Sequence, residues 1–237
     1  MRPLLLALAL ASVLAPCAAA QDVGLGAGLS TRYVWRGTPL GDAVSVQPSL
    51  WLAGDAWELG AWGLATVTAG DADEIDLYAT YAVGPLELGL TDYYFPTEPP
   101  DLGVRSASDV FNVRGDGTGA HSVEAHVTAH AGPAALTAAT FVYNDPTVST
   151  YLEAAVGGDV GGVHLGGAVG AVVALASDGE APGSLFYGTS RRATVTNLLL
   201  SVRRDVPVTS AFSFPAEVQL VVNPETERAY LTLSVQL

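Results

Sequence analysis

The stretch from Asp22 to Arg36, DVGLGAGLSTRYVWR, sorts its side chains by parity. Its odd positions are mostly apolar and end in two aromatic residues, Tyr33 and Trp35. From Gly24 onward its even positions are glycine, serine or arginine, apart from Val34. Because successive side chains of a strand point to opposite faces, one face is apolar and the other is small or charged. A glycine-rich face leaves space rather than packing, which is typical of a strand between lipid and a lumen.

The same alternation recurs in segments of about ten residues, the length that a tilted strand needs to cross a bilayer. We expect strands at 22–36, 43–53, 56–67, 74–83, 86–94, 121–131, 134–143, 148–157, 162–173, 193–204, 210–222 and 228–237. Every second connection is short, and the others include the long loops 95–120 and 174–190. This arrangement predicts an all-β fold, a closed antiparallel up-and-down transmembrane β-barrel of about 12 strands. Closure also removes the exposed sheet edges of such apolar strands.

The N-terminus has the layout of a secretory signal peptide. Arg2 precedes an apolar run from Leu4 to Leu14, and the alanines 18–20 form a cleavage site. We therefore expect a signal peptide at 1–20 and an outer-membrane barrel domain at 21–237. The chain's one cysteine, Cys17, lies within the signal peptide, so the exported protein needs no disulfide.

Composition excludes some classes of protein. Hydrophobic residues make up 49% of the chain, yet no run of 18 apolar residues follows Gln21, so we expect no transmembrane helix. Acidic residues number 24 against 10 basic ones, and the formal net charge is −14. Nucleic acid binding normally requires a basic surface, so a nucleic acid partner is not expected.

Four segments carry a family resemblance: residues 30–37 (STRYVWRG), 47–50 (QPSL), 74–78 (EIDLY) and 223–230 (NPETERAY). With these segments the chain resembles the TorF-type porin family of bacterial outer-membrane proteins, over nearly its whole length after residue 20. The resemblance implies a bacterial outer-membrane barrel with a pore, and it assigns no site residues. One difference is the last residue, Leu237, where outer-membrane barrels usually carry an aromatic residue that the assembly machinery reads.

Residue spacing argues against two kinds of reactive site. Glu124, His126 and His130 share one face of a predicted strand, but the two histidines are separated by roughly 13 Å, too far for one metal ion to join both directly. For a hydrolase, the chain has no G-x-S-x-G motif, and His121 and Ser122 are strand neighbours that point to opposite faces. We expect no catalysis, no metal and no cofactor.

The parity of each strand instead predicts a charged lumen lining, with seven acids and four arginines on inward positions. The predicted lining comprises Glu58, Glu74, Asp76, Glu87, Glu124, Glu153, Glu217, Arg32, Arg36, Arg203, Arg228, His126 and His130. Aromatic residues at strand ends are typical of an interfacial girdle, and we assign Tyr33, Trp35, Trp57 and Tyr81 to it.

Together these features predict a porin-like channel for passive diffusion of small solutes, mildly selective for cations because charged rings set selectivity. The expected partners are outer-membrane lipid, small solutes, and the barrel-assembly machinery through the C-terminal strand 228–237. One alternative is a structural or adhesive barrel with a plugged lumen, whose external loops 95–120 and 174–190 bind a ligand. Another is a secreted soluble β-sandwich.

Overall fold

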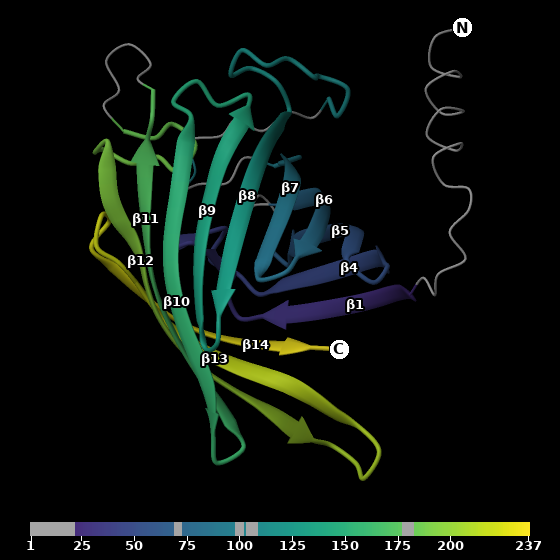
Figure 1. Ribbon diagram of the computed structural model, residues 1–237. Helices are drawn as coiled ribbons and strands as arrows, with labels where there is room; N and C mark the ends of the chain where they lie inside the picture. The colour runs from purple at the N-terminus through teal and green to yellow at the C-terminus, as the bar shows by residue number, and fades with distance from the viewer. Residues whose placement is uncertain (1–21, 69–72, 98–101, 103–108, 177–182) are drawn as a thin grey trace, which may run out of the picture.

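The computed structural model describes residues 22–68, 73–97, 102, 109–176 and 183–237, and the predicted signal peptide lies outside them. Within these residues, twelve strands close into one antiparallel barrel, in the order β1-β14-β13-β12-β11-β10-β9-β8-β7-β6-β5-β4 (Figure 1). The wall strands are β1 (Asp22–Ser30), β4 (Ser45–Ala53), β5 (Trp57–Thr66), β6 (Glu74–Val83), β7 (Leu86–Tyr94), β8 (His121–Ala131), β9 (Ala134–Tyr143), β10 (Ser149–Val160), β11 (Val163–Ala174), β12 (Ala193–Pro207), β13 (Ser213–Asn223) and β14 (Arg228–Gln236).

The barrel confirms the predicted fold class. Each wall strand pairs with the wall strands before and after it in the chain. The pair β1–β14 closes the barrel, and β1 pairs with β4 because β2 and β3 are not part of the wall. The predicted bounds of β6, β7, β8 and β9 agree with the structure at both ends. The sandwich alternative is wrong, because one closed sheet takes the place of two packed sheets.

The outer face carries the large apolar side chains. On β1, Val23 is 71% exposed and Leu25 is 78% exposed, and on β14 Leu231 is 73% exposed. Their strand neighbours Gly24, Tyr230 and Thr232 are less exposed and face inward. The predicted direction of the apolar side chains is therefore confirmed for the first and last wall strands. The described residues include no helix long and apolar enough to span a membrane.

The inward glycines of β1 do not leave space, contrary to the expectation from sequence. The indole ring of Trp51, on the neighbouring strand β4, lies over Gly24 and Gly26, and a Cβ atom on Gly24 would come within 2.1 Å of it. These glycines let a large inward side chain lie flat along the wall, so the narrow barrel gains packing from them.

The connections differ between the two ends of the barrel. Tight turns join β4 to β5, β6 to β7, β8 to β9 and β10 to β11, and we call this the short-turn end. Residues 67–73, 95–120 and 175–192 connect strands at the other end, the long-connection end. The hairpins of β10–β11 and β12–β13 extend beyond the rest of the wall at the short-turn end (Figure 1).

The first connection at the long-connection end enters the barrel. The strand predicted for 22–36 ends at Ser30, and a small hairpin follows, formed by β2 (Val34–Trp35) and β3 (Thr38–Pro39). Its turn has Arg36 at φ 52° and Gly37 at φ 87°, where a glycine is favoured. We call residues 31–44 the plug segment. The next wall strand begins at Ser45, which pairs directly with Ser30.

Candidate functional site

The plug segment spans the lumen and is fixed to the far wall. Arg36 donates two hydrogen bonds to the carboxylate of Glu124 on β8, Nη1 to Oε2 at 2.5 Å and Nη2 to Oε1 at 2.9 Å. Its Nη1 also donates to the hydroxyl of Tyr187, at 2.5 Å. Tyr93 on β7 adds a hydrogen bond to Glu124 Oε1 at 3.3 Å. Glu124 has 1% of its side chain exposed, so a bidentate ion pair lies deep within the barrel.

Aromatic rings surround this ion pair. Trp35 stacks on Tyr187, with ring centroids 5.3 Å apart, and Phe186 stacks on Phe141 at 3.8 Å. The guanidinium of Arg36 lies 4.5 Å from the ring centroid of Tyr151. We call the rings Trp35, Tyr93, Phe141, Tyr151, Phe186 and Tyr187 the aromatic cluster.

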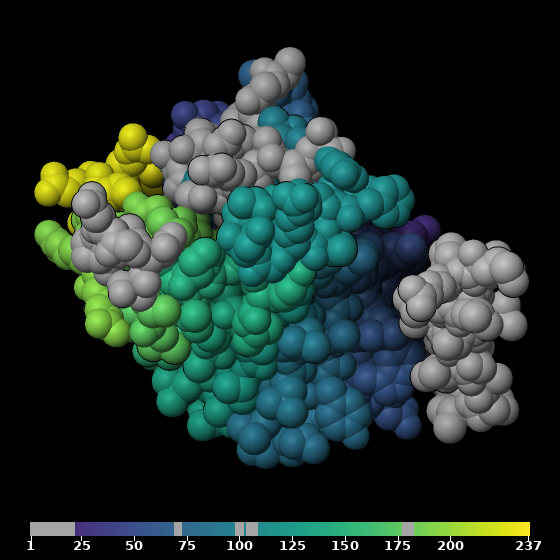
Figure 2. Space-filling view, turned by 90° about the horizontal axis from the view of Figure 1, so that it is seen from above, coloured from purple at the N-terminus to yellow at the C-terminus, as the bar shows by residue number. Residues whose placement is uncertain are grey.

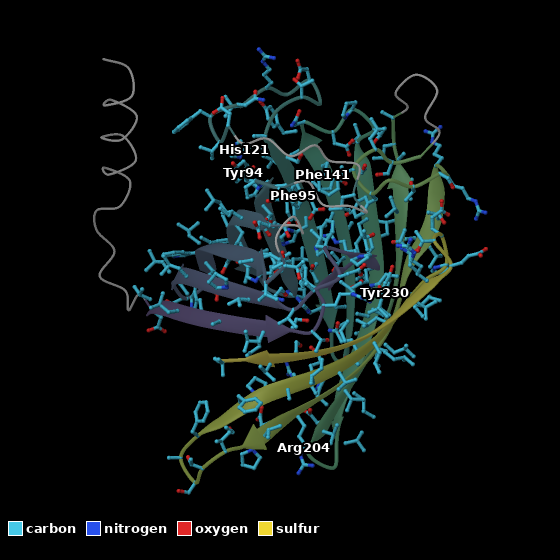
Figure 3. The ribbon with its side chains drawn as sticks, turned by 180° about the vertical axis from the view of Figure 1, so that it is seen from behind. Tyr94, Phe95, His121, Phe141, Arg204 and Tyr230 are labelled. Atoms are coloured by element: carbon cyan, nitrogen blue, oxygen red, sulfur yellow. The ribbon has the colours of Figure 1, made fainter. Side chains whose placement is uncertain are left out.

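Five segments supply the aromatic cluster: the plug segment, the β11–β12 connection, and the wall strands β7, β9 and β10. On each of these three strands the cluster residue lies close to the long-connection end, as Phe141 illustrates in Figure 3. The described residues 109–120 of the β7–β8 connection, teal in Figure 2, also lie over this end of the barrel. The cluster therefore fills the long-connection half of the lumen with buried side chains.

Two residues of the predicted girdle are misplaced. Tyr33 and Trp35 belong to the plug segment and pack against the buried core, with Tyr33 5.2 Å from Trp62. Tyr33 and Trp35 are not part of the wall, because β1 ends at Ser30. Beyond the strand, an odd or even position no longer determines which way a side chain points. Trp57 and Tyr81 pair across β5 and β6 near the short-turn end, and Tyr81 is 51% exposed. Their role in a girdle stays a prediction.

The short-turn half of the lumen is lined by accessible polar groups. The Tyr78 hydroxyl donates to Glu58 at 2.7 Å. Glu87 lies 3.8 Å from the ring of His126, and its side chain is 44% exposed. Glu153 lies at the boundary with the aromatic cluster, where it accepts hydrogen bonds from Tyr151 and from Asn197, the latter at 3.2 Å. The lumen is thus polar in its short-turn half and filled with aromatic side chains in its long-connection half.

The remaining predicted lining residues lie at the ends of the barrel. Arg32 in the plug segment pairs with Asp42 at 3.0 Å. Glu74 and Asp76 lie near Tyr33, and burial together with their negative charges raises the pKa of the Tyr33 hydroxyl. Two further residues, Arg203 and Glu217, are register partners on β12 and β13. His130 and Arg228 are exposed near opposite ends of their strands.

Metal ligation has no support among the described residues, where no three His, Cys, Asp or Glu side chains converge. Of the candidates from sequence, Glu124 is held by Arg36, and His126 lies beside Glu87.

No sequence pattern predicts the residues that fill the lumen from the β11–β12 connection. Phe186 and Tyr187 lie in a glycine- and serine-rich stretch without periodicity. One usable sign was present on β5, where Trp62 and Leu64 place bulk on the inward parity of the strand. Bulky inward residues in a barrel strand indicate a filled lumen at that level.

Comparisons with known proteins do not identify a family for this chain. No family model matches the chain, and no curated protein matches it. Among solved structures, a porin aligns at 13% identity and a TM-score of 0.34, over 81% of this chain and 61% of the porin. An outer-membrane channel from Pseudomonas putida F1 aligns at 12% identity and a TM-score of 0.42, over 94% of this chain and 95% of that one.

A bacterial polysaccharide outer-membrane secretin aligns at 8% identity and a TM-score of 0.43, over 93% of this chain and 97% of that one. These similarities are too low to support a function. Membership of the TorF-type family stays a prediction.

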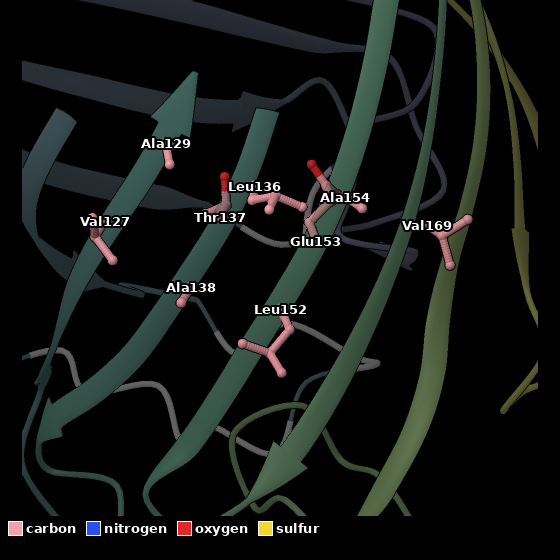
Figure 4. A pocket seen from close by; sticks show the side chains of 9 residues that line it. All are labelled: Val127, Ala129, Leu136, Thr137, Ala138, Leu152, Glu153, Ala154 and Val169. Carbon is pink, nitrogen blue, oxygen red and sulfur yellow. The ribbon is translucent and has the colours of Figure 1, made fainter. Parts of the chain in front are cut away.

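The outer wall also has a shallow groove, across β8 to β11 (Figure 4). Val127, Leu136, Leu152 and Val169 line it, together with smaller alanines. The apolar residues have the outward parity of their strands, and Leu136 is 62% exposed. The groove is mainly a feature of the outer face, although Thr137 and Glu153, which have the inward parity of their strands, also border it.

Proposed function

We propose that the protein is a porin-like channel of the bacterial outer membrane that passes small solutes by passive diffusion. The observation that carries this proposal is the combination of an apolar outer face with a lumen half lined by accessible polar groups. A barrel that faced water on both sides would gain nothing from exposing Val23, Leu25 and Leu231. Closure gives each wall strand a neighbour on both sides, which the interior of a bilayer requires, although β1 and β14 pair directly only over Gly28–Ser30.

The plug segment and the aromatic cluster set the state of this channel. They fill the long-connection half, so solute passage requires the plug segment to move away from Glu124. In this proposal the structure corresponds to a closed or narrow state, and the Arg36–Glu124 pair holds it.

A mild preference for cations is part of the proposal. Arg36 is neutralised by Glu124, and the accessible half carries Glu58 and Glu87. Fixed negative charge along a narrow path favours cations over anions.

Liposome swelling tests the proposed activity. The refolded protein is inserted into liposomes, which are then diluted into isotonic sugars of graded size. We expect swelling with the smallest solutes and none with larger ones. No swelling with any solute, from liposomes that contain heat-modifiable folded barrel, would contradict a channel.

A structural or adhesive barrel is the second candidate, and the aromatic cluster is the observation that favours it. Buried aromatic pairs each add about 0.5–1.5 kcal/mol beyond their buried area, so a tightly filled lumen also suits a barrel that never opens. Such a barrel would give silent liposomes with or without the plug segment in place, which separates the two candidates.

A further inference from the structure

The outer face of the wall carries a polar pair close to the long-connection end. Asp92 on β7 is the register partner of Leu77, which is 56% exposed, so Asp92 also points outward. His121 on β8 is the partner of Tyr94, and Tyr94 is the partner of the outward Ile75. His121 Nδ1 lies 2.9 Å from Asp92 Oδ2, and the Tyr94 ring stacks on the imidazole (Figure 3). Such a pair is costly if lipid covers it directly.

A segment of the β7–β8 connection covers this pair, and we call residues 109–113 the strap. The carbonyl oxygen of Val110 lies 2.7 Å from His121 Nε2. The carbonyl oxygen of Val113 accepts a hydrogen bond of 2.6 Å from the hydroxyl of Tyr143 on β9. Beneath the strap, the histidine of the pair keeps 17% of its side chain exposed and the aspartate 29%.

The register of the sheet places both tethers on the outer face. Tyr143 is the partner of Val123, and Val123 is in turn the partner of Asp92. Tyr143 therefore shares the outward face with Asp92 and His121. The strap lies against the outer side of β8 and β9, and its backbone carbonyls turn toward the wall.

The free side of the strap is apolar. Val110 is 43% exposed, Phe111 is 85% exposed and Val113 is 69% exposed. The side chain of Asn112 turns back into the connection and donates to the carbonyl of Thr118 at 2.9 Å. Three exposed apolar side chains within four residues are unfavourable in water but suit contact with acyl chains.

The position of the strap decides which partner this surface fits. The strap is fixed to the side of the wall that carries the exposed leucines and valines, so its own apolar side chains continue that surface. Long connections face the exterior in barrels of this type, which places the strap at the outer leaflet. We propose that the strap inserts its three apolar side chains among the acyl chains of the outer leaflet, as an anchor that also shields the Asp92–His121 pair from lipid.

This anchor goes beyond the proposed function. It rests on the membrane location in that proposal but not on conduction, because a barrel that never opens could carry the same anchor. The test therefore includes a wall position that reports the membrane location by itself.

Site-directed spin labelling of the full chain, refolded into phosphatidylcholine vesicles, tests the anchor. Cys17→Ala removes the chain's one cysteine, and a nitroxide is then attached at Phe111→Cys or, separately, at Val113→Cys. Leu90→Cys on β7, 52% exposed on the outer face, is the lipid reference. Arg191→Cys, in the β11–β12 connection and 74% exposed, is the water reference. Power saturation compares the accessibility of each label to oxygen, which concentrates in lipid, and to a water-soluble nickel chelate.

We expect the oxygen-to-nickel ratio at both strap positions to lie several-fold above the ratio at position 191 and nearer to the ratio at position 90. Strap ratios nearer to that at position 191, with the label at position 90 in lipid, would overturn the anchor and leave the strap as a water-exposed surface for a protein partner. A nickel-accessible label at position 90 would remove the membrane location and the anchor together. Each variant is first checked for heat-modifiable mobility, and two strap positions keep the test informative if one variant fails to fold.

Discussion

Arg36 Nη2 lies 2.9 Å from Glu124 Oε1, and this contact joins the plug segment to a wall strand on the far side of the barrel. A charged pair is costly to bury unless both partners are present, and here Tyr187 and Tyr93 add hydrogen bonds to it. The main effect of the pair is to hold the plug segment in one position. Its net contribution to stability is small, because the cost of burying two charges offsets their attraction.

Removal of Arg36 alone should therefore destabilise the barrel strongly. Arg36→Met keeps much of the side-chain length but leaves Glu124 charged and unpaired, at a cost of about 3–5 kcal/mol. The double variant Arg36→Met with Glu124→Leu should recover most of that loss, because no uncompensated charge remains. Urea unfolding in lipid vesicles, followed by tryptophan fluorescence, measures both. Equal stability of the single and double variants would contradict a buried pair.

A close approach on β11 gives a second prediction. A Cβ atom on the inward Gly170 would lie 1.9 Å from the hydroxyl of Tyr151, whereas one on the outward Gly167 meets nothing closer than 3.5 Å. We expect Gly170→Ala to cost about 1–3 kcal/mol, since Tyr151 is buried and cannot yield easily. Gly167→Ala is the matched control and should stay within about 0.5 kcal/mol. Urea unfolding in lipid vesicles measures both variants. Similar losses of stability in the two would contradict the packing of Tyr151 against Gly170 inside the barrel.

Neighbouring residues on β12 test the lipid-facing surface. Leu200 is 64% exposed on the outer face, and Ser201 follows it on the inward face. Leu200→Arg should lower stability in vesicles by about 2–4 kcal/mol if the residue lies near the bilayer midplane. Ser201→Arg should cost less, because its side chain enters the polar half of the lumen. The reverse order would contradict the proposed membrane orientation of the wall.

The accessible acids should control ion selectivity. Glu58→Gln and Glu87→Gln remove charge from the polar half, and both should shift the reversal potential toward anions in a salt gradient. Asp109→Asn, in the 95–120 loop, is the control and should leave the potential unchanged. Anion preference of the unmodified protein would remove the proposed selectivity.

Glu225 should make the β11–β12 connection sensitive to acid. Partial burial acts to raise its pKa, but hydrogen bonds from Ser190 and Thr194 outweigh this and hold the pKa of Glu225 below its usual value. The carboxylate therefore stabilises the fold above the ordinary glutamate pKa of about 4.3, and this stabilisation is lost as the pH falls through the lower folded value.

Hydrogen exchange at the Ser190 amide, which donates to Glu225, measures the loss of this stabilisation. After correction for intrinsic rates, protection should fall with acid in the native protein and be low at all pH values in Glu225→Gln. A pH-dependent protection that persists in the variant would show that another group is responsible.

The wall of the barrel was predictable from sequence, and the contents of its lumen were not. Alternation along 74–83 or 121–131 determines a strand and its two faces, because the pleat has a period of two. The plug segment has no such period. Its position depends on Arg36 meeting Glu124, 88 residues away in the chain, and on rings from three wall strands. Parity correctly placed Glu124 inside, but no local pattern identifies its partner.

The measurement that tests this account most directly is single-channel conductance in planar bilayers, with and without the plug segment. Because Ser30 pairs with Ser45, residues 31–44 are replaceable by a two-residue Asn-Gly hairpin turn that joins the two strands. We predict small or rare conductance steps for the native protein and larger, frequent steps for the shortened one. Equal conductance of the two folded barrels would contradict a lumen closed by the plug segment.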